Sequence, residues 1–171
     1  MSVCSRVHHV LVDERTRCVV GTAALPEHQR IDACRLVLRV ATADISSFET
    51  DIPWTAAADW PDIVRQAAEF LSSLREPSRG EDVLYRRTGE VPTDDEQAWE
   101  AFLTFAPYAY DASAWSAESE PIAALADAGE SVVAALTPEQ VSAVAHDIGW
   151  DALVPLKEWR TRHASSGHAP Q

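Results

Sequence analysis

Side chains that could do acid–base or metal chemistry are sequence neighbours at one place in the acidic half of the chain. His146 is followed by Asp147 and then by Asp151. An imidazole beside carboxylates can bind a divalent cation, or it can act as a general base that a carboxylate orients. A histidine in the last turn of a helix is also favoured by the helix dipole, and Asp147 would point about 100° away from it. We therefore interpret His146 as structural and predict no metal and no cofactor.

The remaining histidines and cysteines give no recognisable site. His8 and His9 are adjacent, and adjacent side chains on a strand point to opposite faces, so they cannot serve one metal. The spacing of Cys4, Cys18 and Cys34 matches no zinc framework and suits reduced thiols in a cytoplasmic compartment. The glycine-rich phosphate-binding loops and the common hydrolase and zinc-protease motifs do not occur. No catalytic residue can be assigned on this basis.

The strongest candidate for a binding site is a segment in which aromatic and acidic residues are interleaved. Between Arg87 and Lys157 the chain has thirteen carboxylates and no lysine or arginine. Mixed-sign surfaces are the usual solution for solubility, so this composition favours a functional acidic face with aromatic anchors. The predicted partner-binding residues are Asp94, Asp95, Glu96, Trp99, Glu100, Tyr108, Tyr110 and Trp115. In the alternative interpretation, Trp99 and Phe102 belong to the core and the other aromatic residues pack over them.

Charge and composition exclude several classes of partner. The formal net charge is −13, which argues against binding to nucleic acid or to an anionic membrane surface. No run of eighteen apolar residues occurs, so we predict no membrane span. The N-terminus lacks the apolar segment of a signal peptide, and we expect a cytoplasmic protein. The oligomeric state is left open.

Two functional hypotheses follow. The leading one is a non-catalytic binding protein whose acidic, aromatic face engages a basic protein partner, as an inhibitor, an immunity-type protein or a DNA mimic would. The alternative is a small enzyme or ligand-binding protein of a biosynthetic pathway. It would have an aromatic-walled pocket in which His146 or His28 works with a carboxylate as an acid–base pair.

The elements that would position these residues predict an α+β fold. We expect one domain over residues 1–163 and a flexible tail over 164–171. An N-terminal antiparallel sheet of three to five strands is predicted from alternating or β-branched segments. These segments are residues 7–12, 18–24, 35–41 and 45–52, with a further short strand in 82–87.

Helices are expected to cover one face of this sheet. Amphipathic spacing and start signals predict them near residues 61–75, 94–106 and 138–148. Thr93 with Glu96, and Thr137 with Gln140, have the spacing of capping boxes. Residues 108–120 are predicted to form a loop and 157–162 a short basic turn. For 121–128 and 131–136 the sequence leaves a hairpin and helical turns as alternatives.

Overall fold

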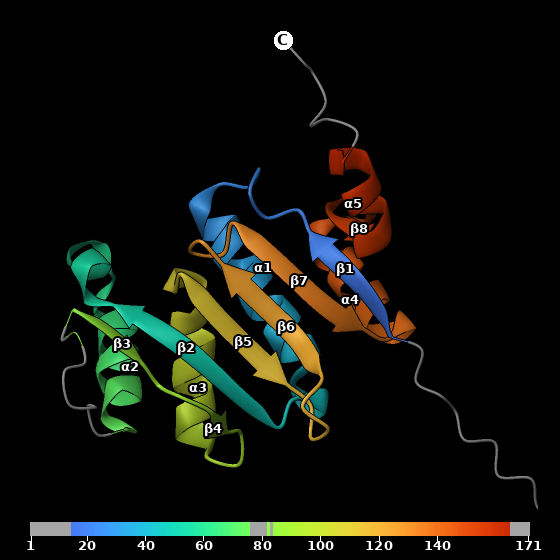
Figure 1. Cartoon of the computed structure of the whole chain (residues 1–171). Coiled ribbons are helices and arrows are strands. Elements are labelled where there is room, and N and C mark those ends of the chain that lie inside the picture. The colour runs from blue at the N-terminus through green and yellow to red at the C-terminus, as the bar shows by residue number, and fades with distance from the viewer. Residues whose placement is uncertain (1–14, 76–81, 83, 165–171) are drawn as a thin grey trace, which may run out of the picture.

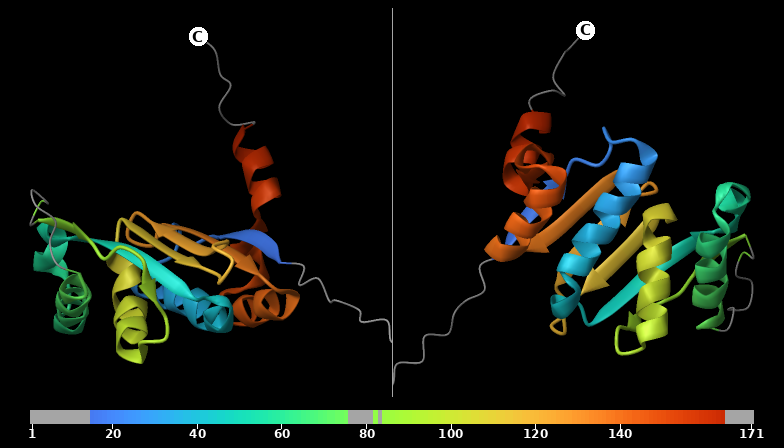
Figure 2. Two further views of the ribbon diagram at one scale, coloured as in Figure 1. Left: turned by 60° about the horizontal axis from the view of Figure 1, so that its bottom comes forward. Right: turned by 180° about the vertical axis from the view of Figure 1, so that it is seen from behind.

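The structure is a computed structural model that describes residues 15–75, 82 and 84–164. It has two layers, an eight-stranded antiparallel sheet and a set of helices packed on one of its faces (Figures 1 and 2). The strands follow the order β3-β2-β5-β6-β7-β1-β8, and β4 also pairs with β2. No helix in the described ranges is long and apolar enough to cross a membrane.

The elements alternate along the chain. The strands are β1 (Thr16–Val20), β2 (Ser47–Pro53), β3 (Tyr85–Arg87), β4 (Val91–Pro92), β5 (Asp111–Trp115), β6 (Pro121–Ala126), β7 (Ser131–Leu136) and β8 (Leu153–Pro155). The helices are α1 (Glu27–Val40), α2 (Asp62–Ser73), α3 (Glu96–Phe105), α4 (Pro138–Ile148) and α5 (Leu156–Ala164). Short 3-10 turns are η1 (Thr42–Asp44), η2 (Trp54–Asp59), η3 (Ala106–Tyr108) and η4 (Trp150–Ala152).

The core lies between the sheet and the helices α1 to α4. In one row of paired residues, Thr50, Ala112, Leu125, Val132 and Val20 follow one another across five strands, and all are buried. Because side chains alternate along a strand, the residues directly before and after each of these five face the other side of the sheet. Small side chains in the middle of the sheet let the helices pack closely on it.

The α+β character, with an antiparallel sheet, and the positions of three helices are confirmed, but the predicted extent of the sheet is wrong. Helices α2, α3 and α4 lie where the amphipathic spacing placed them. The sheet has eight strands instead of three to five, and they are distributed over the whole described chain. Of the predicted strands, 45–52 corresponds to β2, 82–87 to the shorter β3 and 18–24 to β1, while 7–12 lies outside the described residues.

The predicted strand over 35–41 is wrong, because this segment is the second half of α1. Its alternation of apolar residues is also compatible with a helical stripe that starts earlier. Ala33, Cys34, Val37 and Leu38 are all buried and recur at helical spacing. The helical period and the strand period can be told apart only when the whole helix is considered and not residues 35–41 alone.

The predicted loop over 108–120 is wrong as well, since it contains the central strand β5. Ala112 and Ala114 are fully buried, and β5 pairs with β2 on one side and β6 on the other. A strand without β-branched residues has little intrinsic preference for the extended state, so pairing with its neighbours specifies it. The segments 121–128 and 131–136 form a hairpin, which settles the open alternative, and the basic segment 157–162 lies in helix α5.

The two predicted helix caps have different outcomes. The box at α4 is confirmed: the Thr137 hydroxyl accepts from the Gln140 amide at 3.3 Å, and the Gln140 side chain accepts from the Thr137 amide at 2.9 Å. At α3 the predicted cap is wrong by two residues. Asp95 is the N-cap and accepts from two amides of the first turn, whereas Thr93 donates to the carbonyl oxygen of Ile45 at 3.0 Å.

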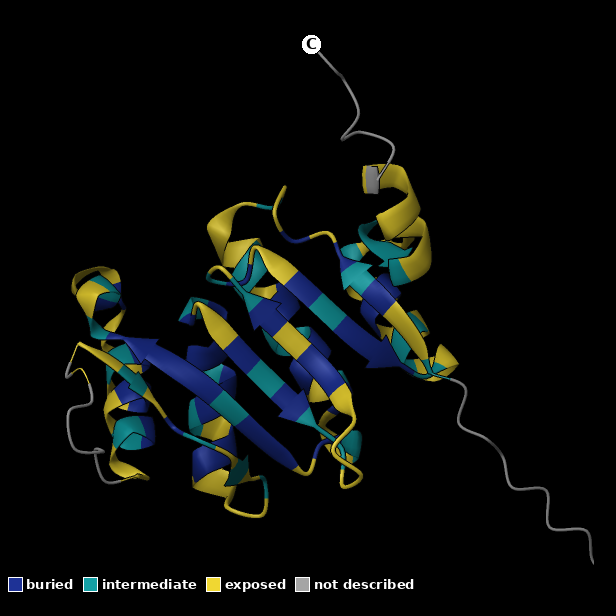
Figure 3. Ribbon diagram, in the orientation of Figure 1, coloured by how far each residue is buried: buried dark blue, intermediate teal, exposed yellow. Residues whose placement is uncertain are grey.

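One face of the sheet has no helical layer over it in the described part of the chain (Figures 1 and 3). We call it the uncovered face. Helix α5 projects from the β1–β8 edge of the sheet, away from the layer of α1 to α4 (Figure 2). The uncovered face and α5 are therefore accessible from the same side.

Candidate functional site

Two acidic segments come together at the end of the sheet where β2 begins and β5 ends. Ser47 pairs with Trp115 of β5 and with Pro92 of β4. The Ser46 amide donates to the carbonyl oxygen of Trp115 at 2.8 Å, and the Thr93 amide donates to that of Ser46 at 3.0 Å. The segment that leads into α3 and the turn between β5 and β6 thus flank the same strand end.

We call this surface the acidic end. Its exposed carboxylates are Glu90 and Asp94 before α3, and Glu118 and Glu120 in the β5–β6 turn. None of these four has an ion-pair partner among the residues that the structure describes. Their negative charges therefore remain uncompensated at the surface.

A hollow of about 220 Å³ lies on the acidic end, lined by Glu49, Glu90, Trp115 and Ser119. The Ser47 hydroxyl donates to the Glu90 carboxylate at 2.8 Å and fixes its position. The volume is below the range of about 300–1,000 Å³ that is usual for small-molecule pockets. Glu49 already pairs with Arg87 at 3.5 Å. Glu90 and the Trp115 indole are the groups left to attract a further cation, through ion pairing and through the face of the ring.

The predicted acidic residues lie at or near this surface. Asp94, Glu96 and Glu100 are exposed at the beginning of α3. Asp95 is exposed too, but its carboxylate already accepts two hydrogen bonds as the helix cap, at 2.9 and 3.1 Å. Trp115 is partly exposed and lines the hollow.

The other predicted aromatic residues do not join Trp115. Trp99 is only 6% exposed and stacks on Phe102 in the core, with ring centroids 5.5 Å apart, as in the alternative interpretation. Tyr108 is half-buried, and burial raises the pKa of its phenol. Tyr110 is exposed, but it precedes β5 and so lies at the opposite end of that strand from Trp115. The predicted set therefore does not form one continuous surface.

Sequence reasoning missed Glu49 and Glu90 as parts of the site. Glu90 belongs to the stretch without cations, and Glu49 lies in the strand predicted over 45–52. Only the pairing of β2 with β4 and β5 brings them together with Trp115. Local sequence patterns do not predict which strands pair in this way.

A second polar cluster surrounds Asp51, which is 1% exposed. Its carboxylate accepts from the amides of Tyr110 and Asp111 at 2.9 and 3.0 Å, and from the Tyr85 hydroxyl at 2.6 Å. The hydrogen bond to Asp51 is the main reason that the pKa of Tyr85 is raised. Asp51 thus joins β2 to β3 and β5, and we assign it a structural role.

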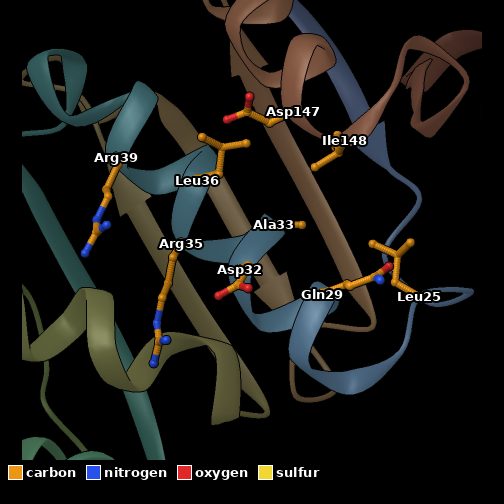
Figure 4. Close-up of a pocket in the computed structure, with 9 residues that line it drawn as sticks. All are labelled: Leu25, Gln29, Asp32, Ala33, Arg35, Leu36, Arg39, Asp147 and Ile148. Carbon is orange, nitrogen blue, oxygen red and sulfur yellow. The ribbon is translucent and has the colours of Figure 1, made fainter.

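A larger groove of about 530 Å³ lies between α1 and α4 (Figure 4). It is lined by Leu25, Gln29, Asp32, Ala33, Arg35, Leu36, Arg39, Asp147 and Ile148. Arg35 and Arg39 point away from Asp147 in Figure 4, and Arg35 donates to two carbonyl oxygens at the end of α3. The lining contains no aromatic residue and no histidine, and its polar groups do not converge.

Metal and thiol chemistry find no support in the described residues. They contain no group of three or more His, Cys, Asp or Glu that could hold a metal ion. His146 is exposed in the last turn of α4. Cys34 is buried, and burial raises the pKa of its thiol to about 12, so it is protonated at neutral pH. Burial also raises the pKa of Cys18.

Comparisons of the chain with protein-family models, with curated proteins and with solved structures found no match in any of the three.

Proposed function

We propose that this protein is a non-catalytic binding protein whose acidic end engages a basic protein partner, in an inhibitor, immunity-type or DNA-mimic role. The observation that carries the proposal is the hollow lined by Glu90 and Trp115, beside exposed carboxylates that have no ion-pair partner among the described residues. A lysine or arginine side chain of the partner fits such a hollow. Its cationic group pairs with the Glu90 carboxylate, and its aliphatic stem packs on the indole.

The surrounding charge suits rapid association. Carboxylates without ion-pair partners on the acidic end, together with a net charge of −13, attract a basic surface over long distances. Such fields mainly accelerate encounter, while a desolvated aromatic anchor mainly slows dissociation. We therefore expect the rim carboxylates to control the association rate and Trp115 to control the dissociation rate.

The test compares two variants of equal charge. In the first, Glu90→Gln, Asp94→Asn, Glu118→Gln and Glu120→Gln neutralise the acidic end. In the matched control, Asp59→Asn, Glu69→Gln, Asp147→Asn and Asp151→Asn neutralise exposed carboxylates elsewhere. Neither set removes a helix cap.

Each tagged protein is used to capture partners from a lysate of its own source at low salt and at about 0.5 M salt, where charges are screened within a few ångströms. We expect the native protein and the control to retain the same basic protein at low salt, and the acidic-end variant to lose it. Retention by both variants alike would refute the proposal, because net charge alone would then explain capture.

The alternative, a small enzyme or ligand-binding protein, is supported by one observation. The groove between α1 and α4 has a volume within the range of small-molecule sites. It lacks the aromatic walls and the His/carboxylate pair that this hypothesis requires. The acidic end therefore carries the stronger proposal.

A further inference from the structure

Arg87 lies beside the acidic end and pairs with carboxylates of two strands. It is opposite Asp51 in the pairing of β3 with β2. Its Nη1 lies 3.5 Å from the carboxylate of Glu49 in β2, and its Nη2 lies 3.1 Å from that of Asp111 in β5. The Arg87 side chain is 48% exposed. A cation of this chain is therefore held next to the hollow, at a place that a partner can reach.

Glu49 has two roles in this arrangement. It pairs with Arg87, and it also lines the hollow together with Glu90 and Trp115. Glu90 accepts from the Ser47 hydroxyl and has no ion-pair partner among the described residues. The hollow thus has one carboxylate that is available to a further cation and one that Arg87 already occupies. A cation bound in the hollow can pair with Glu49 only when Arg87 releases it.

Arg87 can release Glu49 at little cost. Its contact with Asp111 is the shorter of the two and uses the other terminal nitrogen. The pKa of Arg87 is raised, first by a hydrogen bond with Tyr85 and, among the carboxylates, more by Asp111 than by Glu49. Arg87 therefore keeps its stronger partner when Glu49 leaves, and an ion pair this exposed contributes little to stability.

We propose that Arg87 is a built-in competitor for the hollow, which occupies Glu49 until a cationic side chain of the partner displaces it. The partner's cation then lies between Glu90 and Glu49, against the indole of Trp115, while Arg87 keeps Asp111. This inference rests on the proposed function, because it takes the acidic end as the binding surface. It adds the residue that sets how tightly the hollow holds a cation.

The test uses N-acetyl-arginine amide, a probe with a single cationic group, at low salt. Its dissociation constant is measured from the NMR signal of the Trp115 indole N–H, which is identified by its loss in Trp115→Phe. Arg87→Gln should lower the dissociation constant about three- to fivefold, because Glu49 becomes free to pair with the probe. Arg86→Gln is the matched control. It removes the same charge from the neighbouring residue of β3, whose side chain points to the other face, and should have almost no effect.

The two partners of Arg87 separate competition at the hollow from a general change in charge. The gain from Arg87→Gln should disappear in a Glu49→Gln background and persist in an Asp111→Asn background, because only Glu49 lines the hollow. Asp111→Asn alone tests the idea with Arg87 intact. It leaves Arg87 to hold Glu49 more firmly and should weaken probe binding, whereas Asp147→Asn, an equal charge change on α4, should not.

The outcomes distinguish this inference from the proposed function. A probe that shifts the Trp115 signal with the same dissociation constant in the native protein and in Arg87→Gln would overturn the inference alone. A gain that survives Glu49→Gln, or that Arg86→Gln reproduces, would overturn it as well. No shift in any variant would also overturn it, because the hollow would then take no guanidinium. Capture of a basic protein by the acidic end decides separately on the proposed function.

Discussion

Replacing Gly129 with alanine tests how the β6–β7 turn is held against α1. Gly129 has φ +76° and is buried, and its carbonyl oxygen lies 3.8 Å from the Cys34 sulfur. A Cβ at this position would lie only 2.7 Å from that sulfur and 3.5 Å from the carbonyl oxygen of Pro107. Cys34 is fully buried, so it has little room to move away.

Two effects add in this variant. The left-handed backbone conformation costs a residue with a Cβ about 1 kcal/mol relative to glycine. Overpacking of a well-packed site costs about 1–3 kcal/mol more. We therefore expect Gly129→Ala to lower the free energy of unfolding by roughly 2–4 kcal/mol. Gly149→Ala is the control for a positive φ without a steric contact, because Gly149 has φ +89° and nothing within 4 Å of an added Cβ. Its ψ of 145° lies outside the left-handed helical region, so its cost of about 1–3 kcal/mol comes from the backbone alone.

The assay is urea unfolding followed by tryptophan fluorescence, with stability read from the midpoint and slope. In a Cys34→Ala background the steric part should disappear, so Gly129→Ala should cost only about 1 kcal/mol there, while the cost of Gly149→Ala should stay the same in both backgrounds. A cost of only about 1 kcal/mol for Gly129→Ala in the native background would refute the close contact. A cost for Gly129→Ala that Cys34→Ala leaves unchanged would refute it too.

Three further predictions concern individual side chains. Asp95→Ala should destabilise the protein by about 1 kcal/mol in urea unfolding, because the α3 cap is lost, and Thr93→Ala should leave the amides of that helix protected from exchange. Asp51→Ala should cost about 2–4 kcal/mol, since the backbone amides of Tyr110 and Asp111 and the Tyr85 hydroxyl lose their buried acceptor, and Tyr85→Phe should cost much less. Because the pKa of the Cys34 thiol is raised from 9.0 to about 12 in the folded protein, the unfolded chain loses this proton at a lower pH than the folded protein does. The resulting stability is present below about pH 9 and falls above it by up to about 1.4 kcal/mol per pH unit. The free energy of unfolding of Cys34→Ala should therefore fall less steeply than that of the native protein between about pH 9 and 10.5. An equal slope for the two proteins would contradict the burial of the thiol.

Local signals explain which elements the sequence predicts. Helices α2 and α4 carry long apolar stripes and clear start signals, and both lie where expected. Residues 35–41 of helix α1 resemble a strand because their seven-residue alternation hides the helical period of the whole element. Strand β5 has only a weak local strand signal, since its residues other than Trp115 are alanine, serine and aspartate, which do not favour extended structure. Its place between β2 and β6 depends on contacts distant in sequence.

The same distinction applies to the candidate site. Composition located the acidic stretch, but it could not distinguish the buried Trp99 from the accessible Trp115. Both are tryptophans among carboxylates, and only the packing of α3 on the sheet separates them. Glu49 enters the site from a strand that lies before the acidic stretch. Which residues belong to the site depends on the register of the sheet, and a short stretch of sequence does not encode that register.

The most direct measurement of the central claim is the rate at which the captured basic protein associates with the immobilised chain, as a function of salt. At low salt, neutralising the four carboxylates of the acidic end should slow association at least about tenfold, and the difference should vanish near 0.5 M salt. The control with four neutralised carboxylates elsewhere should associate nearly as fast as the native protein, and Trp115→Ala should mainly speed dissociation. Equal association rates for the two charge variants would contradict a binding surface at the acidic end.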